Sequence, residues 1–290
     1  MFNKFGFVIL HYLAVEDTIE CIKSIKEKID TNNYLIVVVD NCSPDGSGCE
    51  LENKYKNDSS VDVIRNIKNL GFSVGNNIGI THARNKGCDF IVVLNNDTYL
   101  LQNNFTYIIL NEYRYSGFAV MGPKVFDPQG YNSTSPILEA EYNGIDERKG
   151  IYNMWRHIYW ESVFGIDILK NAVRGKCNQK VKINLEPNGL SSLRVKGVPL
   201  HGCCLVFSPV YFKYFDGFEE LTFMYGEETI LKMNCDSHKL IMVYNPELKI
   251  FHKEAVSTKK EYTNHKKLVA HNELMYYAAK AIYKKALNND

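Results

Sequence analysis

The chain has 290 residues, 45% of them hydrophobic, which is enough for one large α/β domain or a domain with an appended subdomain. Its 34 basic side chains balance 33 acidic ones, so composition excludes the broad positive field of most nucleic-acid-binding proteins. The eight cysteines include no Cys-x-x-Cys pair, which argues against a zinc site and a disulfide-rich secreted scaffold.

The first residues turn polar at His11, too early for the apolar region of a signal peptide. No stretch is long and apolar enough to span a bilayer. We therefore expect a cytoplasmic protein, either soluble or bound at the inner face of the cell membrane.

Short apolar runs alternate with helical patterns through the first 125 residues, which predicts βαβ units in a mostly parallel central sheet flanked by helices. The predicted strands are Phe5–Leu10, Leu35–Val39, Val61–Ile64 and Phe90–Leu94. The predicted helices lie at about 19–29 and 48–57, and a third follows the glycine-spaced segment Gly71–Gly79 and ends at about Lys86.

The pattern is weaker from about 127 to 193, which we interpret as an insertion on the acceptor side, although aromatic residues between Tyr152 and Ile166 recur at helical spacing. Regular patterns return over about 194–257. They predict a strand at Val198–Phe207, a helix at Glu227–His238, strands at Ile241–Tyr244 and Leu248–Phe251, and a helix over about 261–287. The expected organisation is one domain over 1–257 with a helical extension over 258–290.

Polar residues follow two predicted strands, where open α/β sheets bind ligands. Asp97, after Asn95 and Asn96, can hold Mg²⁺ or Mn²⁺ beside a phosphate, and the alternative is a capped turn. Asp40 can accept hydrogen bonds from a base or a ribose, or it can cap the turn that follows.

Two further positions can carry chemistry. Glu227 and Glu228 begin a predicted helix, where a carboxylate either complements the helix dipole or serves as a general base for an attacking hydroxyl. His252 follows the last predicted strand and is either a metal ligand, a phosphate donor or a structural hydrogen bonder. Three glycines between Gly71 and Gly79 indicate a close backbone approach.

Seven segments, taken in chain order, resemble the family 2 glycosyltransferases of GT-A fold, and most closely the rhamnosyltransferase-like members that build bacterial surface polysaccharides. The segments are Val38–Ser47, Asn69–Gly79, Leu94–Thr98, His201–Phe207, Phe215–Glu220, Phe223–Glu228 and Ile250–His252. The resemblance covers most of residues 5–125 and 196–257.

The resemblance implies a role for each matching residue. Asp40 would contact the nucleoside base, and Asp97, with His252, would bind the metal on the donor diphosphate. The remaining residues of the nucleotide-sugar pocket would be Leu10, Asn77, Asn95 and Asn96. The sequence departs from the family at two points: Asn95 replaces the first acid of the Asp-x-Asp motif, and Glu228 replaces the usual aspartate base, with Glu227 as the second choice.

The implied reaction is a single inverting displacement. The base deprotonates an acceptor hydroxyl, which attacks the anomeric carbon of a nucleoside-diphosphate sugar with Mn²⁺ or Mg²⁺ as cofactor. The expected acceptor is a glycan or a lipid-linked sugar. Basic and apolar residues alternate between Lys259 and Lys285, which favours contact with an anionic membrane; a packed helix or a homodimer contact is the alternative.

Two other functions stay open at this point. A sugar nucleotidyltransferase shares a similar nucleotide pocket, but the first predicted strand is followed by no glycine-rich loop with Arg or Lys for a triphosphate. A nucleotide-sugar-binding protein without transferase activity is the second, and only the departures at Asn95 and Glu228 favour it.

Overall fold

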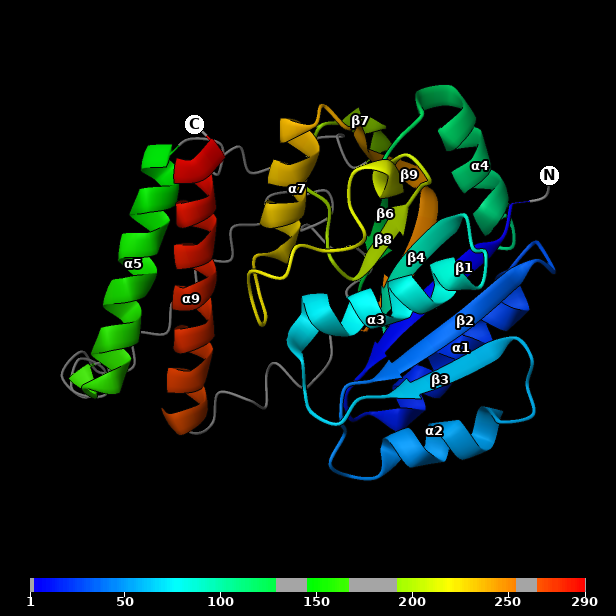
Figure 1. The fold of residues 1–290 in the computed structure, drawn as a ribbon, viewed down its shortest axis with the longest axis horizontal. Helices are drawn as coiled ribbons and strands as arrows, with labels where there is room; N and C mark the ends of the chain where they lie inside the picture. The colour runs from blue at the N-terminus through cyan, green and yellow to red at the C-terminus, as the bar shows by residue number, and fades with distance from the viewer. Residues whose placement is uncertain (1–2, 129–144, 167–191, 254–264, 290) are drawn as a thin grey trace.

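The computed structural model describes residues 3–128, 145–166, 192–253 and 265–289. One mixed sheet of nine strands lies at the centre, with helices on both of its faces (Figure 1). The strand order is β3-β2-β1-β4-β8-β6-β9-β5, and β7 pairs with β9. The α/β class with a flanked central sheet and a C-terminal helix is confirmed.

The N-terminal half of the sheet is parallel. It consists of β1 (Phe5–His11), β2 (Tyr34–Asp40), β3 (Val61–Arg65) and β4 (Phe90–Asn95). Phe7 and Ile9 pack on one face and Val8 on the other, so both faces of these strands are buried. Burial on both faces explains why the strands appear in the sequence as continuous apolar runs.

Helices cover both faces of this half. One face packs against α1 (Val15–Lys28) and α4 (Phe105–Ser116), and the other against α3 (Gly71–Asn85); α2 (Ser47–Tyr55) contacts β3 and α1. The four predicted strands and three predicted helices of this half are all present. The third helix was predicted to begin only after Gly79, whereas α3 already begins at Gly71. The other ends are shifted by a few residues.

The second half of the sheet contains the antiparallel pairs. β8 (Cys204–Phe207) lies antiparallel to both β4 and β6 (Val120–Phe126). β9 (Met242–His252) is parallel to β6, and β5 (Thr98–Leu100) and β7 (Val195–Lys196) pair with it antiparallel. The predicted strand Val198–Phe207 was wrong in its first part, because Pro199 has no N–H to donate to a ladder.

The prediction of two strands at Ile241–Tyr244 and Leu248–Phe251 was also wrong, because both belong to β9. Asn245 pairs with Pro123 and Lys249 pairs with Lys124, so three residues of β9 bulge out between two consecutive partners. A bulge accommodates Pro246 within a continuous strand, so that β9 extends to His252.

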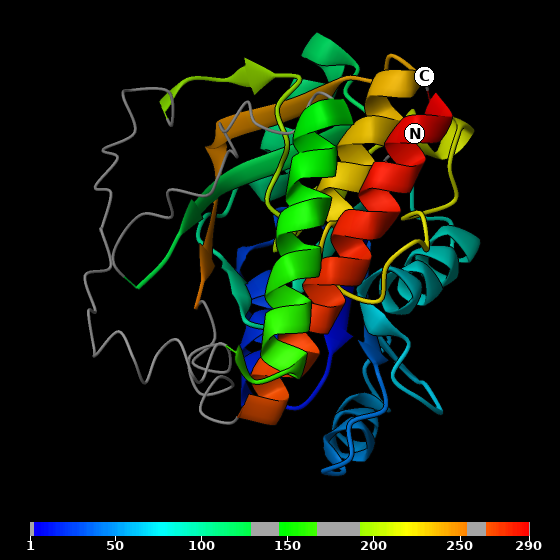
Figure 2. The ribbon, with the colours of Figure 1, turned by 90° about the vertical axis from the view of Figure 1, so that its left-hand side faces the viewer.

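Two long helices, α5 (Ile145–Val163) and α9 (His265–Asn289), lie side by side at one end of the molecule, next to α7 (Glu227–Ser237) (Figures 1 and 2). Stacked rings join them: Tyr276 of α9 lies 5.8 Å from Tyr152 and 5.4 Å from Tyr159 of α5. Both predicted helices are confirmed, whereas residues 129–144 and 167–191 of the expected insertion lie outside the described residues. No helix in the described part of the chain combines the length and apolarity needed to cross a membrane.

Candidate functional site

The ends of three neighbouring strands bring the predicted residues to one edge of the sheet. In the register of β1, Leu10 pairs with Asn95 of β4 and His11 pairs with Asp40 of β2. Parallel strands end at a common edge, so the residues that follow them also share it. The structure thus places Leu10, Asp40 and the Asn95–Asp97 turn together.

Asp40 is buried at the end of β2. Its Oδ1 accepts the backbone N–H of Ser43 at 3.0 Å, which is the turn-capping contact. Its Oδ2 lies against Gly48, where an added Cβ would sit only 1.9 Å from that oxygen. Gly48 is therefore needed to leave room for the carboxylate, and the contact of Asp40 with a nucleoside base stays a prediction.

Asn77 holds a loop in place. Its Oδ1 accepts the N–H of Phe218 at 2.7 Å, and its Nδ2 donates to Phe218 O at 2.8 Å and to Glu220 Oε1 at 2.9 Å. These bonds tie α3 to the segment before α7. The structure gives Asn77 a loop-holding role, and its contact with the nucleotide is untested.

Two buried residues that sequence reasoning missed organise this edge. His11 forms hydrogen bonds with Thr18 Oγ1 (2.7 Å) and Ser47 Oγ (2.8 Å), and burial lowers its pKa. Asn41 accepts the N–H of Leu70 at 3.0 Å and donates to Gly71 O at 3.1 Å. The available signal was a polar residue at the end of an apolar strand: His11 directly follows Leu10, and Asn41 follows Asp40.

Asp97 and His252 form a buried pair. The Nε2 atom of His252 lies 3.2 Å from Asp97 Oδ1, and the side chains are 11% and 9% exposed. β5 brings them together, because Thr98 pairs with His252, and Lys253 N–H donates to Asp97 O at 3.0 Å. By contrast, the amide of Asn96 donates to Thr18 at 3.2 Å.

The pair fits a divalent cation. Two adjacent ligands of an octahedral cation with bonds of about 2.1 Å lie about 3 Å apart, close to the observed separation. The Nδ1 atom of His252 is buried without a hydrogen-bond partner. The described residues contain no cluster of three or more His, Cys, Asp or Glu that could enclose a metal, so oxygens of a substrate would have to complete the coordination.

His201 is a further residue beside this pair, and sequence reasoning missed it. Its ring lies 5.7 Å from that of His252, and its Nδ1 accepts the N–H of Cys203 at 3.1 Å. Burial and the neighbouring His252 lower the pKa of His201 to about 4, so the ring is neutral near pH 7. The His201-Gly202 segment leads directly to the predicted base.

Glu228 and Glu227 begin α7, and both carboxyl groups are enclosed. Glu228 Oε1 accepts the N–H of Gly202 at 3.2 Å, and burial raises its pKa. Glu227 Oε1 has no hydrogen-bond partner, and burial together with the charge of Glu228 raises the pKa of Glu227 to about 7. Both groups therefore meet one requirement of a general base near neutral pH.

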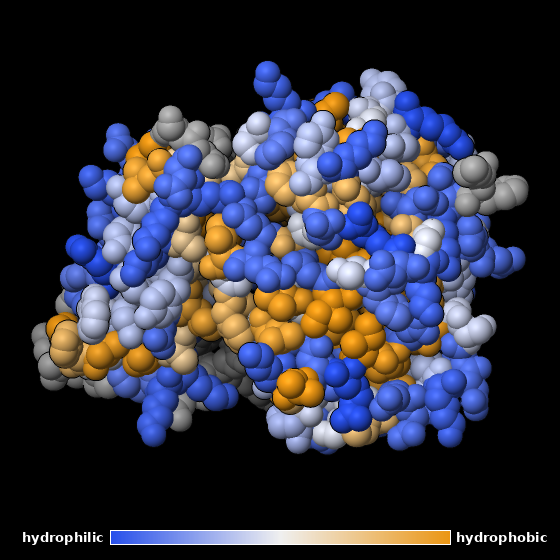
Figure 3. Space-filling view, in the orientation of Figure 1, coloured by the Kyte–Doolittle hydropathy of each residue, from blue (hydrophilic) through white to orange (hydrophobic). Residues whose placement is uncertain are grey.

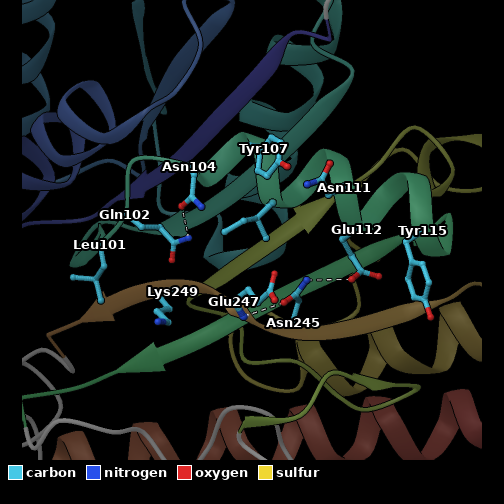
Figure 4. A pocket seen from close by; sticks show the side chains of 11 residues that line it. Leu101, Gln102, Asn104, Tyr107, Asn111, Glu112, Tyr115, Asn245, Glu247 and Lys249 are labelled. Atoms are coloured by element: carbon cyan, nitrogen blue, oxygen red, sulfur yellow. Dashed lines mark hydrogen bonds between the residues drawn. The ribbon is translucent and has the colours of Figure 1, made fainter.

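Glu228 and His201 line a cavity of about 360 Å³, and Glu227 does not. A larger cavity of about 660 Å³ lies between α4 and β9 and is lined by none of the predicted site residues (Figure 4). Glu112 in its wall accepts hydrogen bonds from Arg194 at 2.7 Å and from Asn245 at 3.1 Å. This network ties the bulge of β9 to α4, which is a structural role.

Comparison with known proteins identifies the family. The model for "Glycosyl transferase family 2" matches residues 7–167, more than half of the chain. The chain belongs to glycosyltransferase family 2. This family 2 enzyme catalyses glycosyl transfer, which removes the nucleotidyltransferase and the non-catalytic binding protein from consideration.

Relatives agree with this assignment. The glycosyltransferase is 24% identical over 251 residues to the N-acetylglucosaminyl-diphospho-decaprenol L-rhamnosyltransferase of Mycobacterium tuberculosis, covering 83% of this chain and 73% of the relative. Its fold is similar to that of S. aureus TarS 1–349 in complex with UDP-GlcNAc (TM-score 0.54, 15% identity, 99% of this chain and 72% of that one). It is also similar to GalNAc-T7 with UDP, GalNAc and Mn²⁺ (TM-score 0.56, 11% identity, 87% and 44%).

Proposed function

We propose that the chain is an inverting, metal-dependent transferase that moves a sugar from a nucleoside diphosphate to a hydroxyl of a lipid-linked sugar or glycan. One arrangement carries the proposal. Asp97 contacts His252, His252 lies beside His201, and His201 lines the same cavity as Glu228. A metal-binding carboxylate and a base therefore lie at the two ends of one row of side chains.

Asp97 and His252 are the proposed metal-binding residues, with Mn²⁺ or Mg²⁺ as the cation. A bound cation would neutralise the charge that grows on the departing diphosphate. Asp97 is enough as the only acid, because His252 supplies a second ligand and the donor phosphates supply oxygens. The solved structures of TarS with UDP-GlcNAc and of GalNAc-T7 with UDP and Mn²⁺ support this class of donor and cofactor.

Glu228 is the proposed base. It lines a cavity that can hold the attacking hydroxyl, whereas Glu227 does not. A raised pKa makes a carboxylate a stronger base while it is still ionised near neutral pH. Glu228 takes the proton as the hydroxyl oxygen bonds to the anomeric carbon and the diphosphate departs from the opposite face, which inverts the configuration.

We further propose that the acceptor is lipid-linked and that the protein works at a membrane surface. The name of the M. tuberculosis relative describes transfer to a sugar on diphospho-decaprenol. On this chain, α9 carries five lysines together with apolar residues, a composition that suits an anionic surface. The homodimer alternative for this helix stays a prediction.

Thermal stabilisation tests the donor site. The purified protein is heated with UDP, dTDP, GDP or CMP, each with and without Mn²⁺ or Mg²⁺. The proposal predicts that one nucleoside diphosphate raises Tm and that the metal enlarges the effect. Stabilisation by none of the four nucleotides, with either metal, would contradict it.

A further inference from the structure

The cavity of about 360 Å³ that contains Glu228 lies between α5, α9 and the start of α7. Its lining residues come mainly from these three helices, and α9 lies between α5 and α7 (Figure 1). Apolar surface gathers where α9 meets the rest of the molecule, whereas the outer side of the helix pair is mostly hydrophilic (Figure 3). The helix pair therefore encloses an apolar space next to the proposed base.

The polar end of this cavity lies close to the proposed metal-binding pair. Glu228 and His201 both line it, and the His201 ring lies 5.7 Å from that of His252, which contacts Asp97. A hydroxyl placed beside Glu228 would thus lie near the proposed diphosphate site. The cavity is accordingly placed to hold the molecule that supplies the attacking hydroxyl.

The other end of the cavity is lined by apolar side chains that neighbouring contacts hold in place. Trp155 of α5 meets His271 of α9 edge to face at 6.2 Å, and His271 Nδ1 lies 3.2 Å from the hydroxyl of Tyr225. Ala278 and Ala279 of α9 also line the cavity and are almost fully buried. Because these two side chains are small, they leave open a space that larger residues would fill.

The cavity lining includes one acidic and one basic side chain. Among the described residues that line the cavity, Glu228 is the one acid and Arg148, in the first part of α5, is the one Arg or Lys. A guanidinium group binds phosphate through paired, charge-assisted hydrogen bonds. The lining therefore suits a ligand that has a free hydroxyl, apolar surface and an anionic phosphoryl group.

We propose that this cavity is the acceptor subsite and that it selects a sugar joined through a phosphoryl group to an apolar chain. The acceptor hydroxyl lies at Glu228, the phosphoryl group lies at Arg148, and the apolar part packs against Trp155 and the two alanines. This assignment rests on the proposed function, because an acceptor is needed only if Glu228 acts as the base. It also gives the helix pair a role in acceptor choice.

Fluorescence of Trp155 reports binding directly. The protein has two tryptophans, so Trp160→Phe leaves Trp155 as the sole emitter. The probes are N-acetylglucosamine joined to an undecyl chain through a diphosphate and the same glycoside without the diphosphate, both below their micelle concentrations. We expect saturable binding of both, with the diphosphate probe bound more tightly.

Two substitutions and one control then locate the site. Ala279→Phe fills the cavity and should lower the affinity for both probes by at least about tenfold. Arg148→Gln should lower the affinity for the diphosphate probe alone, also by about tenfold. Ala281→Phe adds the same ring two residues further along α9 at a position outside the cavity, and it should leave both affinities unchanged. If Ala279→Phe fails to fold, Arg148→Gln tests the proposal alone.

The assignment would be overturned if each probe bound the parent protein, Ala279→Phe and Arg148→Gln with the same affinity. The same holds if Arg148→Gln weakens the two probes equally or if Ala281→Phe acts like Ala279→Phe. Stabilisation by a nucleoside diphosphate, measured on the same samples, separates this failure from that of the proposed function. If the nucleotide raises Tm but the substitutions leave probe binding unchanged, the protein has a donor site and its acceptor subsite lies elsewhere.

Discussion

The Nε2 atom of His252 lies 3.2 Å from Oδ1 of Asp97, which joins the end of β9 to the turn after β4. The short strand β5 creates this contact, because it follows Asp97 directly and pairs Thr98 with His252. In the proposed metal site, a carboxylate and an imidazole together would provide two ligands, so the site would not need an acid at Asn95.

Replacing Asp97 should remove the metal dependence of nucleotide binding. Asp97→Ala removes the carboxylate of the proposed metal-binding pair, so the Tm increase produced by Mn²⁺ with the stabilising nucleotide should disappear. Turnover should fall by about 10²–10³, as for other lost electrostatic contacts to a leaving group. Asp216→Ala, which removes a carboxylate that is 97% exposed, is the control. A metal response retained in Asp97→Ala would rule out this residue as the ligand.

Gly48→Ala should weaken nucleotide binding through Asp40. The new Cβ would lie 1.9 Å from Asp40 Oδ2, so the carboxylate must move. We expect about a tenfold increase in Kd for the nucleotide in isothermal titration, and a loss of stability of about 1–3 kcal/mol. Gly150→Ala is the control, since no atom lies within 4 Å of its added Cβ. Unchanged affinity in Gly48→Ala would show that the nucleotide does not depend on Asp40.

The raised pKa of Glu227 makes folding stability depend on pH. The folded state keeps this proton up to about pH 7, whereas the unfolded chain loses it near 4.5, so stability should fall as pH rises between these values. At about 1.4 kcal/mol per pKa unit, the total loss of folding stability is about 3 kcal/mol. Glu227→Gln should remove this loss and be the more stable protein at pH 8 in urea unfolding. Parallel pH profiles for the two proteins would be inconsistent with the raised pKa.

Asn77→Ala should loosen the segment that leads to α7. It removes three hydrogen bonds to Phe218 and Glu220 and leaves backbone groups of Phe218 without partners. The expected cost is about 1–3 kcal/mol, with faster hydrogen exchange over residues 217–226. Asn85→Ala, at an exposed position of the same helix, provides the comparison. Equal exchange in the two variants would argue against the loop-holding role.

Much of the fold could be predicted because its parallel strands are buried on both faces. Such strands appear as apolar runs, and the polar residue at each end marks the functional edge, as at Asp40 and Asp97. The errors arose where local pattern and pairing disagree. β9 contains Pro246, which is typical of a strand boundary, and only the pairing with β6 shows that the strand continues through a bulge.

The site was predicted in part for a similar reason. Motif positions predicted Asp97, Glu228 and His252 for the candidate site, but His201 acquires its place through packing between His252 and the cavity. Asn77 was predicted to line the nucleotide pocket, but its amide donates to Phe218 O, in a segment more than a hundred residues away. Contacts of this range cannot be read from local spacing.

The most direct test compares turnover of the wild-type protein and Glu228→Gln. Release of the nucleoside diphosphate from its sugar donor is measured with the diphosphate-linked N-acetylglucosamine acceptor, and nucleotide stabilisation confirms that the variant is folded. We expect acceptor-dependent release by the wild type and a loss of about 10²–10⁴ in kcat for Glu228→Gln. Wild-type turnover in Glu228→Gln, with the nucleotide response intact, would contradict the account.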